Sequence, residues 1–163
     1  MDIDTLLIRE VVHALKRQGL MLATAESCTG GWVAQVITSV AGSSEWFERG
    51  FVAYTNLAKR EMLGVSTTTL SRYGAVSEQC ARAMAEGALT HSHAQVALAI
   101  TGIAGPSGGT PEKPVGTVCF AWAAKKRDTI SRKHVFIGDS EAVRRQAVAT
   151  ALQGLLGFLK PNE

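Results

Sequence analysis

The stretch ATAESCTGGWVAQVI, residues 23–37, combines residue types that could attack a carbonyl group or hold a phosphate. It ends an apolar segment at Ser27 and places Gly30 and Gly31 before a predicted helix. A serine hydroxyl becomes a nucleophile when a base removes its proton, and N–H groups at the helix start could stabilise the resulting oxyanion. Glycines let the backbone approach a ligand because they carry no Cβ. The same residues would also suit a helix N-cap followed by glycines needed for packing.

Cys28 is an alternative nucleophile in this turn, because a thiolate at a helix N-terminus has a lowered pKa. If strand geometry continues past Ser27, the two side chains point in opposite directions. We therefore expect Cys28 to be buried as a small apolar residue. The backbone of Cys28, Thr29, Gly30 and Gly31 is expected to contribute to the substrate site.

The four histidines do not supply an obvious base for Ser27. None follows a predicted strand end at which the candidate loops meet; they are His13, His91, His93 and His134. Surface histidines are mostly solvated. A Ser-His-Asp triad is therefore not supported.

Lysine is the remaining candidate base, in the segment YTNLAKR that follows a predicted strand. Tyr54 and Asn56 precede Lys59, and a helix starting there could turn the lysine amine toward Ser27. Lysine acts as a base near neutral pH only if burial or nearby positive charge lowers its pKa. A solvated lysine on an exposed helix face is the competing interpretation.

The glycine-rich segment TGIAGPSGGTPEKPVG, residues 101–116, follows another apolar strand. It lacks the GxxxxGK[ST] and GxGxxG spacings, but its N–H groups could bind an anion, with Thr101 and Lys113 as possible helpers. We expect Gly102 and Gly105 to line the ligand site. A connection of this length favours a functional role over an ordinary surface loop.

Two arginines near the start of the last predicted helix could clamp a phosphate or carboxylate in the same cleft. They are Arg144 and Arg145. Cations near a helix N-terminus oppose the helix dipole, which suggests a purpose beyond helix stability for one of them.

The elements that must position these residues alternate between helices and strands. Helices are predicted over 3–17, after Gly31 with an apolar stripe reaching Val40, over 56–63, from a Ser77 cap to about His91, and from Asp139 or Ser140 to Leu159. Strands are predicted over 20–25, 51–54, 95–101, 116–124 and 130–137, with the Lys125-Lys126-Arg127 run forming the turn of a hairpin. The pattern predicts an α/β fold, a three-layer α/β/α sandwich with a mixed, mostly parallel sheet. Ligands in such folds collect beyond the carboxyl ends of the strands.

Composition limits the class of protein further. The 163 residues, 46% of them hydrophobic, fit one globular domain over residues 1–163. A net charge of +3 without a long basic run argues against a nucleic-acid partner. Three cysteines without CxxC spacing argue against a disulfide framework or a zinc site, and neither a signal peptide nor a membrane span is predicted. We therefore expect a cytoplasmic protein without a metal.

Five segments in this order resemble the CinA C-terminal-domain family: TAESCTGG, YTNLAK, TGIAGP, KPVGTV and GDSEAVRRQA. The resemblance covers nearly the whole chain and implies the same three-layer fold. It implies the activity of the family's stand-alone deamidases, which hydrolyse the carboxamide of nicotinamide mononucleotide to nicotinate mononucleotide and ammonia. No cofactor is implied.

The resemblance also implies roles for individual residues. Ser27 matches the family's nucleophile, Lys59 its general base, and Tyr54 and Thr101 the polar residues beside them. The functional arginine lies in the VRR element, where we favour Arg144 over Arg145.

Other possibilities remain at this point. One is a module that binds a nucleotide without hydrolysing it, and another is a Ser-Lys amidase or esterase for a different acyl group. A homo-oligomer is also possible, because three aromatic residues near the site could lie in an interface or in the core. They are Trp32, Trp46 and Phe47.

Overall fold

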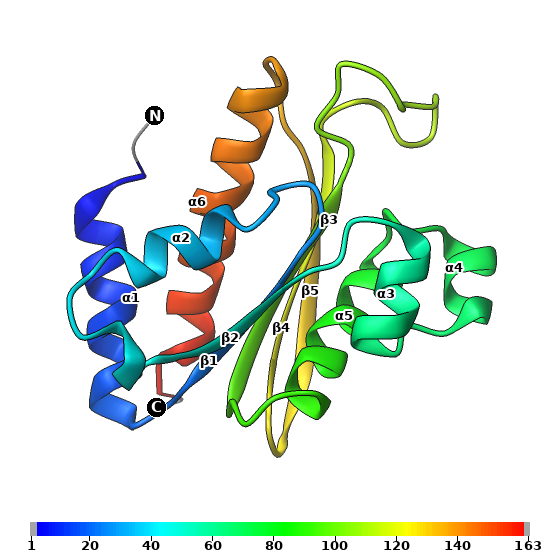
Figure 1. Ribbon diagram of the computed structural model, residues 1–163. Coiled ribbons are helices and arrows are strands. Elements are labelled where there is room, and N and C mark those ends of the chain that lie inside the picture. Colours follow the sequence, from blue (N-terminus) through cyan, green and yellow to red (C-terminus); the bar gives the residue numbers. More distant parts are fainter. Residues whose placement is uncertain (1–2, 162–163) are drawn as a thin grey trace.

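The computed structural model describes residues 3–161 and contains one five-stranded sheet with helices on both faces (Figure 1). The strand order is β2-β1-β3-β4-β5. The strands are β1 (Leu22–Glu26), β2 (Phe47–Val52), β3 (Val96–Gly102), β4 (Thr117–Ala124) and β5 (Arg127–Val135). β1 pairs in parallel with β2 and β3, whereas β4 is antiparallel to both β3 and β5. Four of the five strands thus run in one direction, which confirms the mixed, mostly parallel sheet.

The helices form the two outer layers of the sandwich (Figure 1). One layer contains α1 (Thr5–Gln18), α2 (Trp32–Thr38) and α6 (Ser140–Leu159). The other contains α3 (Asn56–Leu63), α4 (Thr67–Tyr73) and α5 (Glu78–Thr90). A short 3-10 helix, η1 (Ser43–Glu45), precedes β2. None of the helices within residues 3–161 combines the length and hydropathy that a membrane span requires.

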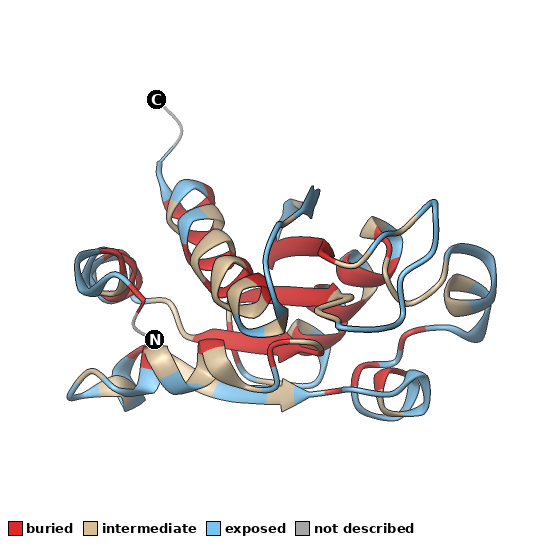
Figure 2. Cartoon of the chain, turned by 90° about the horizontal axis from the view of Figure 1, so that it is seen from above, coloured by how far each residue is buried: buried red, intermediate tan, exposed pale blue. Residues whose placement is uncertain are grey.

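Side-chain size differs between the two faces of the sheet. Toward α1, α2 and α6 the central strands present large residues such as Leu22, Ile100 and Trp122. Toward α5 they present small ones, among them Ala23, Ala25, Ala97, Ala99, Ala121 and Ala123. Because side chains alternate between faces along a strand, the buried central strands contribute to a hydrophobic core on each face of the sheet (Figure 2). The alanine face allows α5 to pack close to the sheet.

The α3 helix packs closely against α5 at Gly87. A Cβ built on Gly87 would lie 1.9 Å from the backbone oxygen of Leu63, the last residue of α3. Gly87 is fully buried in α5. Glycine is therefore required here by the approach of two backbones.

Most predicted elements are present, with shifted ends. β2 begins at Phe47 instead of residue 51, and it is an edge strand with several exposed residues. β5 spans Arg127–Val135, so Ile137 lies outside the strand. α2 ends at Thr38, so Val40 packs on the core from outside the helix. Helix α4 was not predicted from the sequence, because it has no buried residue and no strong apolar stripe.

The structure settles which residue caps α6 and places one of the three aromatic residues, Trp46, in the core. Ser77 caps α5 through Cys80 N, and Asp139 rather than Ser140 caps α6. Trp46 is only 1% exposed and lies in the core, while Trp32 and Phe47 are partly buried against it.

Candidate active site

The carboxyl ends of β1, β2 and β3 meet at one edge of the sheet. Glu26, the last residue of β1, pairs with Val52, the last residue of β2, and with Ile100 of β3, which continues to Gly102. The loops beyond them enclose a cleft of about 620 Å³. Its lining includes these residues singled out by the sequence: Ser27, Cys28, Thr29, Gly30, Tyr54, Asn56, Lys59, Thr101, Gly102, Gly105 and Arg144.

Ser27 and Lys59 are in hydrogen-bond contact inside this cleft. Lys59 Nζ lies 3.0 Å from Ser27 Oγ and 3.0 Å from the backbone oxygen of Tyr54. Ser27 is 6% exposed and Lys59 only 1%. The structure thus brings together the predicted nucleophile and the predicted base.

The start of α3 positions Lys59. Thr55 caps the helix by accepting a hydrogen bond from Ala58 N at 3.0 Å. Lys59 lies one turn into the helix, and its amine reaches back to the Tyr54 carbonyl that precedes the cap. A single loop therefore supplies both the amine and an acceptor that orients it.

Burial lowers the pKa of Lys59 below its ordinary value of 10.5. Removing the ammonium group from water disfavours the charged form. When Lys59 is neutral, its lone pair can accept the Ser27 hydroxyl proton while an N–H still donates to Tyr54 O. When Lys59 is charged, it donates to Ser27 Oγ, and the hydroxyl can turn to the Tyr54 oxygen, 3.4 Å away. The pair can thus exist in a reactive and an unreactive protonation state.

The turn after Ser27 supplies N–H groups close to the nucleophile. It is closed by a bond from Gly30 N to Ser27 O at 3.1 Å, and Gly30 and Gly31 adopt positive φ angles of 62° and 100°. Glycine tolerates this conformation better than any other residue. Among residues 3–161, neither the N–H of Cys28 nor that of Thr29 donates a hydrogen bond to another residue. Those two groups remain available to a ligand.

The N-terminus of α2 itself is already occupied, which corrects the expectation that it would face a ligand. The buried carboxylate of Glu26 accepts hydrogen bonds from Val33 N at 2.9 Å and Ala34 N at 3.1 Å. Gly31, the N-cap residue, has no side chain that could do this. Any oxyanion site must therefore use the turn rather than the helix end.

Cys28 lines the cleft but has the wrong protonation state for a nucleophile. Burial and the nearby carboxylate of Glu26 raise the pKa of its thiol to about 12. It is partly buried and packs against the hydrophobic core, consistent with the predicted apolar role. Ser27 is the better nucleophile of the two.

Tyr54 and Thr101 lie in the cleft, but their contacts differ from those expected. Tyr54 meets the Ser27–Lys59 pair through its backbone oxygen, while its side chain is 69% exposed at the rim. Thr101 is buried, and its hydroxyl donates to Ala75 O at 2.9 Å. A threonine hydroxyl has one proton, so this bond leaves Thr101 to act on a ligand as an acceptor.

Of the two arginines, only Arg144 lines the cleft, and Lys113, which was expected to help bind an anion, does not line it. Arg144 lines the cleft, held by a bond from its Nε to Ser140 O at 3.3 Å, whereas Arg145 is absent from the lining. Lys113 donates to Tyr73 O at 2.7 Å and does not line the cleft. Gly31 lies just beyond it, in a shallow extension that also contacts Arg144.

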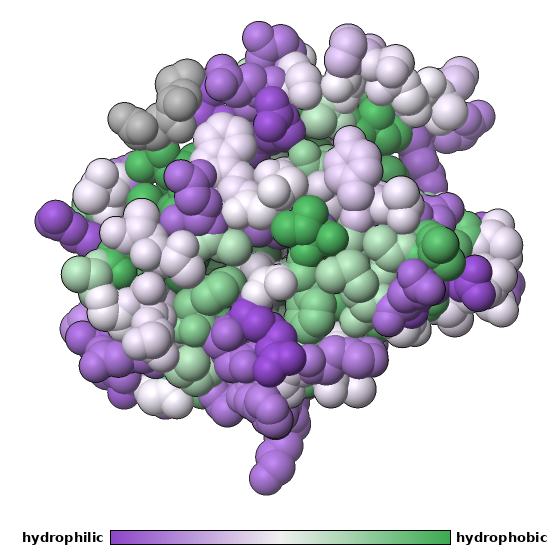
Figure 3. Space-filling model, in the orientation of Figure 1, coloured by the Kyte–Doolittle hydropathy of each residue, from purple (hydrophilic) through white to green (hydrophobic). Residues whose placement is uncertain are grey.

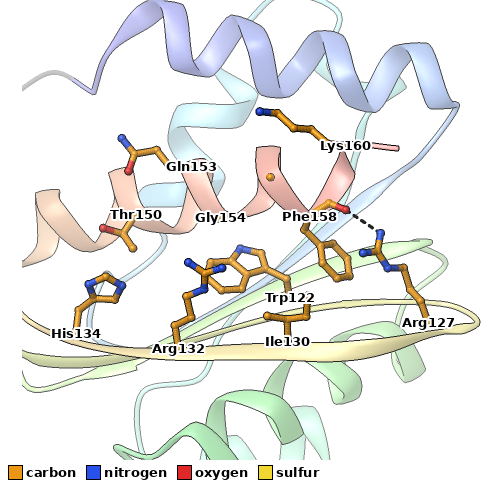
Figure 4. Close-up of a pocket in the computed structure, with 11 residues that line it drawn as sticks. Trp122, Arg127, Ile130, Arg132, His134, Thr150, Gln153, Gly154, Phe158 and Lys160 are labelled. Atoms are coloured by element: carbon orange, nitrogen blue, oxygen red, sulfur yellow. Dashed lines mark hydrogen bonds between the residues drawn. The ribbon is translucent and has the colours of Figure 1, made fainter. Parts of the chain in front are cut away.

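A second groove of about 470 Å³ lies between β5 and α6, away from Ser27 (Figure 4). It is lined by Arg127, Arg132, His134 and Lys160 without a carboxylate. Arg127 is fixed by a bond to Phe158 O at 2.7 Å. Among the residues that line the groove, no hydroxyl is in hydrogen-bond contact with a lysine amine, so the first cleft is the better candidate for nucleophilic chemistry. Within the described residues, no group of three or more His, Cys, Asp or Glu side chains is arranged to hold a metal ion.

The fold and this cleft define an α/β protein with a buried serine–lysine pair at the carboxyl edge of a mixed sheet. Residues 4–159 match the family model described as the CinA C-terminal domain, and the chain belongs to that family.

Relatives cover most of the chain. It is 58% identical over 149 residues to nicotinamide-nucleotide amidohydrolase PncC of Escherichia coli strain K12, covering 91% of this chain and 90% of that protein. PncC of Pseudomonas putida is 49% identical over 96% of this chain and 97% of its own. The crystal structure of competence/damage inducible protein CihA from Agrobacterium tumefaciens superposes with a TM-score of 0.93 at 45% identity, covering 98% of this chain and 100% of that one.

Proposed function

We propose that the protein is a nicotinamide-nucleotide amidohydrolase, which converts nicotinamide mononucleotide and water to nicotinate mononucleotide and ammonia. One observation carries the proposal: a buried lysine, with its pKa lowered, lies 3.0 Å from a serine hydroxyl in an open cleft. The names of relatives 49–58% identical over nearly the whole chain support the choice of substrate.

In the first half of the reaction, neutral Lys59 removes the Ser27 proton as Ser27 Oγ attacks the carboxamide carbon. The carbonyl oxygen becomes an oxyanion, which the N–H groups of Cys28 and Thr29 stabilise. Lys59 then protonates the nitrogen, the C–N bond breaks, and ammonia leaves an acyl ester on Ser27.

In the second half, Lys59 takes a proton from water, and the hydroxide attacks the ester. The tetrahedral intermediate collapses, Lys59 returns the proton to Ser27 Oγ, and nicotinate mononucleotide leaves. The Tyr54 backbone oxygen keeps the amine oriented in both halves.

The 5′-phosphate binds the Gly102–Gly108 loop and Arg144, which line the same cleft as Ser27. The guanidinium offers paired donors to phosphate oxygens. Binding the phosphate there fixes the carboxamide near Ser27, so the attack becomes effectively unimolecular. The three free cysteines suit a reducing compartment, and we propose that the enzyme acts in the cytoplasm.

The test is ammonia release from nicotinamide mononucleotide by the purified protein, alongside Ser27→Ala. Release by the parent and none by the variant is the expected result. Binding of the nucleotide without ammonia release by either protein would refute the hydrolase and leave a binding module. Release from other amides or esters alone would indicate a different substrate.

A further inference from the structure

Glu26 is a buried carboxylate that the reaction scheme above does not use. It is 1% exposed and directly precedes Ser27. Its Oε1 accepts hydrogen bonds from Thr29 Oγ1 at 2.6 Å and Val33 N at 2.9 Å, and its Oε2 accepts one from Ala34 N at 3.1 Å. Within residues 3–161, no lysine or arginine forms an ion pair with it. A carboxylate buried without a cation is costly unless hydrogen bonds satisfy it, so its three donors must be well placed.

Two of these bonds cap a helix, and the third reaches the catalytic turn. The bonds to Val33 and Ala34 satisfy free N–H groups of α2 and place negative charge at the positive end of the helix dipole. Capping alone would not require the third bond. The Thr29 hydroxyl ties the middle of the turn after Ser27 to the same carboxylate.

This connection controls the N–H groups on which the oxyanion depends. Within residues 3–161, Thr29 contributes one of the two N–H groups of the turn that donate to no other residue, and Cys28 contributes the other. The turn contains two glycines in succession, which give it little stiffness of its own. The Glu26–Thr29 bond is a side-chain restraint that supplies the missing stiffness.

We propose that Glu26 is a positioning residue, which acts through Thr29 to hold the turn after Ser27 in the geometry that stabilises the oxyanion. The inference rests on the proposed amidohydrolase function. Glu26 touches neither the substrate nor Lys59 in this scheme. Its contribution should therefore appear in kcat rather than in KM or in the titration of Lys59.

Thr29→Val is the most direct test, because it removes the link to the turn and keeps the carboxylate and both helix bonds. We expect kcat for nicotinamide mononucleotide to fall by about tenfold or more, as small displacements of catalytic groups do. KM should stay within about twofold. The acid limb of the pH–rate profile should not move, since the pKa of Lys59 depends on burial and on Cys80 and Cys28.

Glu26→Gln is the second variant. An amide cannot accept hydrogen bonds on its nitrogen, so at least one of the three donors loses its acceptor. We expect a lower Tm and a smaller fall in kcat than in Thr29→Val, because the amide oxygen can still accept from Thr29 Oγ1. Ser66→Ala is the matched control, because Ser66 caps α4 through Thr69 N at 3.0 Å, outside the cleft. It should lower Tm and leave kcat unchanged.

The outcomes separate the two levels of the proposal. An active parent whose Thr29→Val variant keeps full kcat would overturn the positioning role and leave the amidohydrolase intact. A loss of kcat in Ser66→Ala as large as in Thr29→Val would also overturn the positioning role. Loss of a helix cap outside the cleft would then lower kcat just as much. A parent protein without ammonia release would refute the proposed function, and the positioning role with it.

Discussion

Within residues 3–161, the Ser27–Lys59 pair has no carboxylate partner, and this bears directly on the chemistry that we propose for it. Within residues 3–161, Lys59 forms no ion pair, and its contacts are a hydroxyl and a backbone oxygen. An acidic neighbour would raise the pKa of the amine and keep it charged. Burial among neutral groups does the opposite and favours the form that accepts a proton.

The first prediction concerns pH. Because only neutral Lys59 can take the Ser27 proton, kcat should rise with pH through the pKa of Lys59 and fall as the pH drops below it. Burial lowers that pKa, so the midpoint should lie below 10.5. Steady-state ammonia release across a buffer series measures it. A midpoint at or above 10.5 would contradict the assignment of Lys59 as the base.

The second prediction distinguishes the adjacent arginines. Arg144→Ala should raise KM for nicotinamide mononucleotide by about tenfold or more, since a hydrogen bond to a charged group contributes about 1.5–3 kcal/mol. Arg145→Ala, outside the cleft lining, should leave KM within about twofold and serves as the control. Equal effects of the two substitutions on KM would argue against the proposed phosphate contact.

Residue types and order were enough to predict which residues gather in the cleft, but not which atoms meet. Ser27 and Lys59 were predictable because each follows an apolar strand, and adjacent parallel strands end at one edge. The contact through the Tyr54 carbonyl was not, because every residue carries a backbone oxygen. No role for Glu26 was predicted from the sequence. A carboxylate at the end of an otherwise apolar strand does indicate a buried side chain that needs hydrogen-bond donors.

Among the elements, α3 is the one whose position matters most for chemistry. It carries Lys59 and rests on α5 at Gly87, where two backbones approach too closely for a side chain. The amine is therefore located by a helix–helix contact that lies outside the cleft.

The third prediction tests this contact with Gly87→Ala. The new Cβ would lie 1.9 Å from Leu63 O, and a backbone atom cannot yield without moving α3. We expect the free energy of unfolding to fall by about 1–3 kcal/mol, and kcat to fall as Lys59 shifts. Thermal unfolding and ammonia release measure the two effects.

Gly157→Ala in α6 is the control for this substitution. A Cβ at Gly157 would meet no atom within 4 Å, so the variant should gain about 1 kcal/mol of helix propensity. A Gly87→Ala protein as stable and as active as the parent would show that α3 can adjust freely.

The missed helix α4 and the strand with the largest error in its start, β2, share a physical cause. α4 buries no residue and β2 lies at an edge, so neither carries the apolar periodicity by which elements are recognised. Their positions depend on tertiary contacts and on caps such as Ser66. The fully buried β1, β3 and β4 were predicted within one or two residues, since continuous apolar runs identified them.

At the scale of the whole molecule, burying the amine of Lys59 lowers the stability of the folded chain. Below its lowered pKa, Lys59 is charged in the folded and unfolded chains alike, and the folded chain bears the full penalty of burying that charge. Between the lowered pKa and 10.5, Lys59 is neutral in the folded chain and protonated in the unfolded chain. Because the unfolded chain then binds more protons, the contribution of Lys59 to the free energy of unfolding becomes more favourable as the pH rises.

The fourth prediction follows from this linkage. Lys59→Met keeps the length of the side chain and removes the charge, so it should raise Tm near neutral pH by about 2–4 °C for each kcal/mol gained. The same variant should release no ammonia. The gain in Tm should shrink as the pH approaches 10.5, and a loss of stability at neutral pH would contradict the linkage.

Apolar surface also surrounds the cleft on the side of β2 and α3. The exposed apolar residues of β2 and α3 include Val52 and Leu57, at 48% and 56% exposed. Figure 3 shows hydrophobic surface in the middle of the face that it draws. The polar groups of the cleft thus lie beside a partly apolar rim.

The reversed direction of β4 has a consequence for how this scaffold can diversify. The loop that we propose to bind the phosphate joins adjacent antiparallel strands, and Gly102 at one end pairs with Val118 at the other. Because the sheet already holds both ends together, doubling the length of the loop would cost only about 0.6 kcal/mol of closure entropy. Insertions there would leave Ser27, Lys59 and their strands undisturbed. Substrate range could therefore evolve, or be engineered by loop grafting, independently of the hydrolytic machinery.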